Sequence, residues 1–258
     1  MLQYLKRYLQ FWLKSTNEHG VHSPFVFDFV TKCLYDKSVF PDYTALQNNR
    51  KSLYKNKQII EVTDFGSGSK IFKSNQRAVH QIAKTAGITP KRAQLLYRIT
   101  RYFEPNHILE LGTSLGLATA SLSLGNPKVK ITSVEGCPKT AHLAAQQFQK
   151  MSIQNIDLQN ISFYDFFSTI PKTQQYQLIY IDGNHSETAT IAYFEQLLPH
   201  ISAQTILILD DINWSSQMQN AWKTIKIHPK VTATIDTFGW GILFFRTEQK
   251  QEQFTIRF

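Results

Sequence analysis

Glu110-Leu111-Gly112-Thr113-Ser114-Leu115-Gly116 follows directly on the apolar run His107-Ile108-Leu109. This order predicts a buried strand that breaks into a glycine turn and then opens a helix. Gly112 allows the sharp turn, and Gly116 allows the helix to pack close to the strand. Such a turn leaves backbone N–H groups free at a helix N-terminus, where they face a ligand.

A second acidic residue, Glu135, ends the next apolar run, Ile131–Val134. A carboxylate in that place can accept hydrogen bonds from the two hydroxyls of a ribose. Dinucleotide-binding folds have glycine where this chain has Glu110, so that their backbone can approach a pyrophosphate. Glu110 would repel a pyrophosphate and attract a cationic group. The two acidic residues therefore predict a site for a nucleoside-containing cofactor.

Length and composition favour one large α/β domain, alone or with an accessory segment, because the chain has 258 residues of which 42% are hydrophobic. No run approaches the roughly 18 apolar residues of a membrane span. The segment Met1–Lys14 is broken by Lys6 and Arg7 and has no cleavage pattern, so we do not interpret it as a signal peptide. Cys33 and Cys137 lie far apart, which favours a reducing cytoplasm and excludes a cysteine-rich zinc site.

The net charge of +9 raises the question of an anionic partner such as RNA. The lysines and arginines are scattered, however, and no run of five or more occurs. A solvated basic surface is the favoured interpretation.

Helices and strands are predicted to alternate from about residue 75 onward. Thr89 is expected to cap a helix that begins at Pro90, because Thr accepts backbone N–H bonds and Pro suits a first helical position. The near-continuous apolar runs at 177–182 and 205–210 are typical of strands covered on both faces by helices. The predicted helices are 75–86, 90–103 and 138–151, and the predicted strands end at 110, 135, 163, 182 and 210, followed by a hairpin of 231–237 and 241–246.

The first 75 residues differ in character and are expected to form a helical extension or lid, separate from a main domain over 76–258. Residues 1–14 place apolar side chains on one helical face, which favours docking onto the main domain or onto a second copy in a homodimer over attachment to a membrane surface. The string 19–25 predicts a turn and an N-cap before a helix over 25–34. The glycine loop Gly66–Ser69 is interpreted as a flexible loop near the active site.

Acidic residues follow the last two predicted strands of the parallel sheet. Asp182-Gly183-Asn184-His185 follows one strand, and Asp210-Asp211 follows the other. Ligands of open parallel sheets bind at the carboxyl ends of the strands, so these side chains are expected beside the cofactor. Asp182, Asp210 and Asp211 are a candidate set of ligands for Mg²⁺, which prefers oxygen donors. His185 is a candidate base, or else a residue that orients its loop or packs on the adenosine.

The E-x-G-x-x-x-G pattern with the later Glu135 resembles motif I and the following acidic motif of class I S-adenosylmethionine-dependent methyltransferases. Residues 89–116 resemble the catechol and caffeoyl-CoA type O-methyltransferases, and Asp182-Gly-x-His185 with a later acidic pair resembles a related branch that acts on sugars and small metabolites. The resemblance covers roughly residues 78–246. One difference is that the catechol-type enzymes carry a lysine base after the first of these aspartates, where this chain has His185.

This resemblance implies a doubly wound, mostly parallel, seven-stranded sheet of the Rossmann-like methyltransferase type, with a C-terminal antiparallel hairpin and a helical N-terminal extension. It implies S-adenosylmethionine as cofactor, with a possible Mg²⁺, and a hydroxyl of a small molecule as methyl acceptor. The expected cofactor-binding residues are Glu110, Gly112, Thr113, Ser114, Gly116, Glu135, Gly136, Ser162, Phe163 and Asp182. The expected catalytic residues are Asp182, His185 and Asp210, and the expected metal ligands are Asp182, Asp210 and Asp211.

Two other functions compete with this one. An RNA methyltransferase would use the basic charge, but the chain has no Asn/Asp-Pro-Pro-Tyr/Phe signature and no appended RNA-binding module. A non-catalytic binding protein on the same fold is the second alternative. The intact Glu110, Gly112, Gly116, Glu135 and Asp182 argue against it.

Overall fold

The computed structural model describes residues 2–65, 72, 74–248 and 250–258. The chain divides into two compact units, Lys37–Ile170 and Met1–Asp36 with Pro171–Phe258. The first 75 residues are thus shared between the two units. The predicted loop Gly66–Ser69 lies outside the described residues.

In the described part of the unit Lys37–Ile170, three parallel strands lie in the order β3-β4-β5. Their bounds are β3 (His107–Leu111), β4 (Lys130–Val134) and β5 (Ile156–Gln159). The register pairs Leu111 with Val134 and Val134 with Gln159, so the three strands end side by side. These strands end at Leu111 and Val134, each within one residue of the predicted ends at 110 and 135, and the ends meet at one edge.

Helices connect these strands, as the alternation in the sequence predicts. They are α5 (Pro90–Phe103), α6 (Leu117–Gly125), α7 (Pro138–Lys150) and α8 (Phe163–Thr169). The Thr89 side chain accepts a hydrogen bond from the Arg92 N–H at 3.3 Å, and Pro90 is the first helical residue. The predicted cap is confirmed.

Two predictions in this unit are wrong. The strand expected up to Phe163 ends at Gln159, because Ser162 accepts a hydrogen bond from the Asp165 N–H and begins α8. The helix expected over 75–86 begins only at Val79, since Gln76–Ala78 forms β2, which pairs antiparallel with β1 (Ile59–Glu61). Pairing with a distant strand overrides the local helical pattern there.

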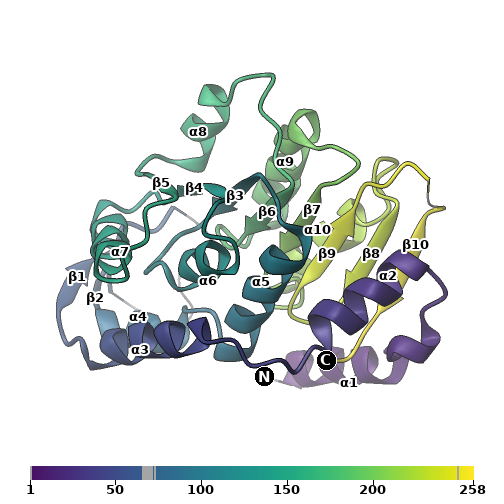
Figure 1. The fold of residues 1–258 in the computed structure, drawn as a ribbon, viewed down its shortest axis with the longest axis horizontal. Coiled ribbons are helices and arrows are strands. Elements are labelled where there is room, and N and C mark those ends of the chain that lie inside the picture. Colours follow the sequence, from purple (N-terminus) through teal and green to yellow (C-terminus); the bar gives the residue numbers. More distant parts are fainter. Residues whose placement is uncertain (1, 66–71, 73, 249) are drawn as a thin grey trace. The chain divides into compact units, whose positions relative to one another are not determined.

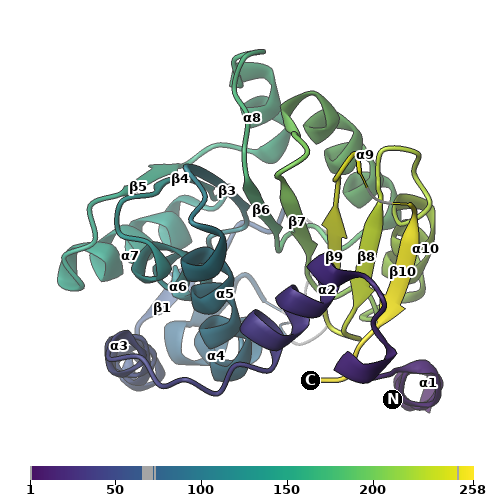
Figure 2. The ribbon, with the colours of Figure 1, turned by 45° about the vertical axis from the view of Figure 1, so that its right-hand side comes forward.

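The amino-terminal part of this unit also contains α3 (Asp42–Lys55) and α4 (Val79–Thr85). Helix α3 packs against α4 and α6 (Figure 2). Aromatic rings fill the space between α3 and α5, where Tyr43 and Tyr97 lie 5.2 Å apart between centroids. This packing brings the segment before residue 75 against the helices that precede and follow β3.

The described residues of the second unit form five strands in the order β10-β8-β9-β7-β6 (Figure 1). They are β6 (Leu178–Ile181), β7 (Ile206–Leu209), β8 (Ala233–Asp236), β9 (Gly241–Phe244) and β10 (Glu252–Thr255). Strands β6 and β7 are parallel, and β8 and β9 form the predicted antiparallel hairpin. Strand β10 pairs in parallel with β8 and was not predicted, because its short polar sequence lacks the apolar run of a central strand.

Helices of this unit are α9 (Glu187–Leu197), α10 (Ser216–Ile225), α1 (Leu2–Lys14) and α2 (Pro24–Phe29), the last continuing as a π-helical turn over Val30–Leu34. The rings of Tyr4, Tyr8 and Phe11 pack around Phe238 with centroids 5.0–5.4 Å apart. The helix thus packs on its own unit through these rings, whereas Leu5, Leu9 and Trp12 of the predicted apolar face are 50–57% exposed. Docking of that face onto a second copy stays a prediction. The two chain ends meet where the Thr16 N–H donates to the Thr255 carbonyl at 2.8 Å (Figure 1).

Among the described residues no helix combines the length and the apolar character that a membrane crossing needs. Cys33 and Cys137 are both buried and free of disulfide bonds.

Candidate cofactor site and acidic strand ends

The glycine turn after β3 has three residues with positive φ: Gly112 at 106°, Ser114 at 49° and Gly116 at 77°. The Gly112 N–H donates to the Val134 carbonyl at 2.9 Å, and the Gly116 N–H donates to the Thr113 carbonyl at 2.9 Å. These two donors of the turn are therefore engaged within the protein. Free N–H groups begin in the first turn of α6, which lacks intrahelical acceptors.

Gly116 has a different packing role from the expected one. A Cβ atom at this position would lie 2.6 Å from Cε1 of Phe148 on α7. The close neighbour of Gly116 is thus a side chain of α7 rather than β3. The positive φ and this contact together require glycine.

Glu135 begins the loop after β4, and backbone donors hold its carboxylate at both oxygens. Its Oε2 accepts from the Ser114 N–H and its Oε1 from the Cys137 N–H, both at 2.8 Å. Burial raises the pKa of this carboxyl group, while these hydrogen bonds act in the opposite direction. An ionised carboxylate offers about four lone pairs, so each oxygen retains a site for a hydroxyl donor.

Asn160 supports this loop and was not predicted. Its Nδ2 donates to the Glu135 carbonyl at 2.7 Å and to the Gly136 carbonyl at 3.2 Å. Ser162 and Phe163, expected to flank an adenine, are half-buried at the start of α8.

Glu110 is fully buried at the end of β3. Its Oε2 accepts hydrogen bonds from the hydroxyls of Thr119 and Ser133, both at 2.5 Å, while its Oε1 has no hydrogen-bond partner among the described residues. Burial raises the pKa of Glu110 to about 7, against the lowering effect of the two hydroxyls. In this structure the hydrogen-bond donors to the carboxyl group are therefore side chains of the protein itself.

The segment that follows β1 contacts the loop after Glu135. The Thr63 N–H donates to Cys137 Sγ at 3.4 Å, and a Cβ atom at Gly136 would lie 2.7 Å from Cδ2 of Phe65. Phe65 is 59% exposed, although it is a large apolar side chain. The contact of this aromatic residue with the Glu135 loop could not be predicted, because the two lie about 70 residues apart in the sequence.

The second unit carries the remaining candidates. Asp210 is buried after β7, and its Oδ2 accepts from the Tyr180 hydroxyl at 2.5 Å. The same hydroxyl lies 3.3 Å from Oδ2 of Asp182, which follows β6. Tyr180, which sequence reasoning missed, therefore brings Asp182 and Asp210 together.

His185 lies beside Asp182, with 3.6 Å between Nε2 and Oδ1, and both side chains are about three-quarters buried. Asp211 adopts a positive φ of 55°, and its backbone N–H donates to Oδ1 of Asp210 at 2.6 Å. The predicted neighbourhood of Asp182 and His185 is thus present, and both oxygens of Asp210 accept protein hydrogen bonds.

Asp182, Asp210 and Asp211 are also the expected ligands of a metal ion. The described residues contain no group of three or more His, Cys, Asp or Glu side chains arranged to hold a metal ion. Asp182, Asp210 and Asp211 are therefore not arranged as a three-ligand set in this structure, and their assignment as metal ligands stays a prediction.

Part of the chain that carries these residues resembles a known family of proteins. Residues 109–212, which include Glu135, Asp182 and Asp210, match a family model described as a methyltransferase domain. The chain has the fold of class I S-adenosylmethionine-dependent methyltransferases. The predicted fold class is thus confirmed, as a mixed, mostly parallel sheet with an antiparallel hairpin and N-terminal helices. No curated protein sequence matches the chain.

Three solved structures illustrate the likeness. The methyltransferase PaMTH1 of Podospora anserina, bound to S-adenosylhomocysteine, has 15% identity and a TM-score of 0.62, covering 88% of this chain and 97% of that one. An O-methyltransferase of Bacillus cereus in complex with S-adenosylhomocysteine has 16% identity and a TM-score of 0.56, over 83% and 98% of the two chains. The O-methyltransferase TomG of Streptomyces achromogenes, in complex with S-adenosylmethionine, has 15% identity and a TM-score of 0.54, over 62% and 82%.

Proposed function

We propose that this chain is an S-adenosylmethionine-dependent methyltransferase that methylates a hydroxyl oxygen of a small molecule. The observation that carries the proposal is the Glu135 carboxylate, held by two backbone donors beside the glycine turn. This arrangement lies within the segment that matches the methyltransferase domain model. Two of the similar structures are of O-methyltransferases, which supports oxygen as the acceptor atom.

Glu135 would bind the two ribose hydroxyls, because each of its oxygens keeps a lone pair after accepting one backbone N–H. When bound, the cofactor supplies an electrophilic methyl group on a sulfonium. The protein then contributes mainly alignment of the two reactants, which is worth roughly 7–11 kcal/mol in favourable cases.

His185 is the proposed base, with Asp182 as the group that orients its ring at 3.6 Å. A new bond forms between the acceptor oxygen and the methyl carbon, and the carbon–sulfur bond breaks with its electron pair passing to sulfur. The hydroxyl proton passes to the imidazole of His185, which is suited to accept it near neutral pH. No step of this proposal depends on a metal ion.

Calorimetric titration with S-adenosylhomocysteine tests the proposal. We expect one site of micromolar affinity per chain. The absence of binding to a folded sample, as judged by circular dichroism, would overturn the proposal and favour a non-catalytic protein.

The chemical class of the acceptor needs a separate test. The protein is incubated with methyl-labelled S-adenosylmethionine and a cell extract, which is then separated by size. Label in the small-molecule fraction that resists ribonuclease supports the proposal. Label in a large, ribonuclease-sensitive fraction would instead identify an RNA acceptor.

A further inference from the structure

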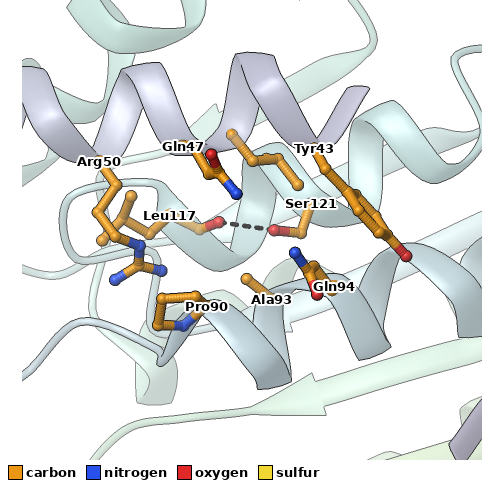
Figure 3. Close-up of a pocket in the computed structure, with 9 residues that line it drawn as sticks. Tyr43, Gln47, Arg50, Pro90, Ala93, Gln94, Leu117 and Ser121 are labelled. Carbon is orange, nitrogen blue, oxygen red and sulfur yellow. Dashed lines mark hydrogen bonds between the residues drawn. The ribbon is translucent and has the colours of Figure 1, made fainter. Parts of the chain in front are cut away.

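A pocket between α3, α5 and α6 lies wholly within the unit Lys37–Ile170 (Figure 3). It contains about 290 Å³ of space that protein atoms do not fill, including the space open to solvent. The lining residues are Tyr43, Leu46, Gln47, Arg50, Pro90, Ala93, Gln94, Leu117 and Ser121.

Arg50 is the charged residue of this lining and is only 8% exposed. Its guanidinium has one hydrogen bond to a described residue, from Nη1 to the Tyr54 hydroxyl at 3.5 Å, the weak end of the range. Among the described residues no carboxylate forms an ion pair with it. A buried charge is costly unless a counter-ion accompanies it. The arrangement therefore points to an anionic ligand.

The position of the pocket indicates which anion would bind in it. Leu117 is the first residue of α6 and follows Gly116 of the glycine turn directly, and Pro90 is the first residue of α5. Figure 3 shows the Arg50 side chain extending from α3 toward Pro90, with Leu117 beside it. The start of a helix favours negative charge, because its first N–H groups lack intrahelical acceptors.

Two neutral residues complete the lining on its polar side. The side-chain amides of Gln47 and Gln94 come from α3 and α5 and line the same pocket (Figure 3). Each amide can donate two hydrogen bonds, and a planar guanidinium can donate two parallel ones to a carboxylate. The donor set suits a carboxylate.

We propose that Arg50 binds the carboxylate at the amino-acid end of S-adenosylmethionine. This inference rests on the proposed function, with the ribose held at Glu135 and the amino-acid end directed past the glycine turn to the start of α6. The segment before residue 75 would then supply a cofactor ligand.

The test compares two ligands that differ by one carboxylate, S-adenosylhomocysteine and decarboxylated S-adenosylhomocysteine, in calorimetric titrations. We expect Arg50→Gln to weaken binding of S-adenosylhomocysteine about 10- to 100-fold, as for a lost charged hydrogen bond, and to change binding of the decarboxylated ligand less than about twofold. Arg50→Lys should recover part of the loss, because it keeps the charge without the fork of donors. Lys51→Gln is the matched control, since it removes an exposed charge from the same helix.

The following outcomes would each contradict the inference. Equal weakening of both ligands would mean that Arg50 only supports the fold. Equal affinity of the unmodified protein for both ligands would mean that no group recognises the carboxylate, and this comparison holds even where an Arg50 variant fails to fold. Loss in Arg50→Gln of thermal stabilisation by inorganic phosphate, with unchanged affinity for S-adenosylhomocysteine, would assign the pocket to another anion. Failure of the unmodified protein to bind either ligand would instead remove the proposed function.

Discussion

Glu110 carries a fully buried carboxyl group whose pKa is raised to about 7, first by burial and also by the charge of Glu135. The ordinary value for this group is 4.5. The folded protein therefore holds a proton that the unfolded chain releases at lower pH. This contribution to stability is fully present below pH 4.5 and is lost as the pH rises through about 7.

We expect Glu110→Gln to abolish this dependence, because glutamine does not titrate. From this group alone, the free energy of unfolding of the unmodified protein should fall on the order of 3 kcal/mol between pH 4.5 and 7. Urea unfolding at several pH values measures it. Glu195→Gln, an exposed position, is the control. If the free energy of unfolding of Glu110→Gln fell with pH as steeply as that of the unmodified protein, the assignment of this pH dependence to Glu110 would be contradicted.

Glu135→Ala should weaken binding of S-adenosylhomocysteine about 100-fold, since the substitution removes the acceptor for the ribose and also leaves the Ser114 and Cys137 N–H groups without their partner. Calorimetry measures the affinity. Asp157→Ala, which removes an exposed carboxylate from β5, should bind as the unmodified protein does. Equal affinity for both variants would show that the ribose binds elsewhere.

At the scale of elements, the glycine turn depends on α7. Gly116→Ala places a methyl group 2.6 Å from the Phe148 ring and requires a non-glycine residue at φ 77°. We expect a loss of roughly 2–4 kcal/mol in the free energy of unfolding, from overpacking and backbone strain together.

The double variant Gly116→Ala with Phe148→Leu separates the two causes. It should show less than the sum of the two single losses, because the smaller side chain relieves the clash and leaves only the backbone strain. Additive losses in urea unfolding would mean that the ring contact is not the cause.

Three rings of helix α1 pack on one aromatic side chain, Phe238. Phe238→Ala removes the ring contacts with Tyr4, Tyr8 and Phe11, each worth about 0.5–1.5 kcal/mol. We expect faster amide hydrogen exchange over α1 and unchanged exchange in β3 and β4. Leu9→Ala, at a side chain that is 57% exposed, should leave exchange as it was. Protection of α1 in the Phe238 variant would show that other contacts hold it.

At the scale of the whole molecule, the candidate residues fall into two sets. The unit Lys37–Ile170 carries Glu110, the glycine turn and Glu135, and the unit of Met1–Asp36 with Pro171–Phe258 carries Asp182, His185 and Asp210. The proposed function assigns cofactor binding to the first set and proton transfer to the second. Substitutions in the first set should therefore impair cofactor binding, and substitutions in the second set should impair methyl transfer with cofactor binding retained.

His185→Ala should leave the affinity for S-adenosylhomocysteine within about twofold and lower the rate of label transfer to the small-molecule fraction about 100-fold or more, the usual contribution of a general base. His142→Ala, at an exposed position on α7, is the control. A normal transfer rate in the His185 variant would remove the proposed base. A loss of cofactor affinity would assign His185 to the adenosine instead.

Much of the fold follows from local pattern. Apolar runs predict β3, β4, β6 and β7 because central parallel strands are buried on both faces, and Thr89-Pro90 predicts the start of α5 because capping acts within one turn. Strands β2 and β10 were missed, because their short polar sequences become strands only through pairing with β1 and β8. Ser162 and Phe163 were placed on a strand because the helix that they begin depends on a single cap.

Local sequence patterns are sufficient for β3, β4, β6 and β7, for the turn at Gly112 and for the carboxylate that follows β4, since backbone conformation and hydrophobic period are properties of neighbouring residues. Tertiary structure alone decided that Glu110 is enclosed by Thr119 and Ser133, that Tyr180 joins Asp182 to Asp210, and that Arg50 lies beside Leu117. The physical reason is that a side chain's partners depend on packing and register between segments far apart in the chain, which no local pattern encodes.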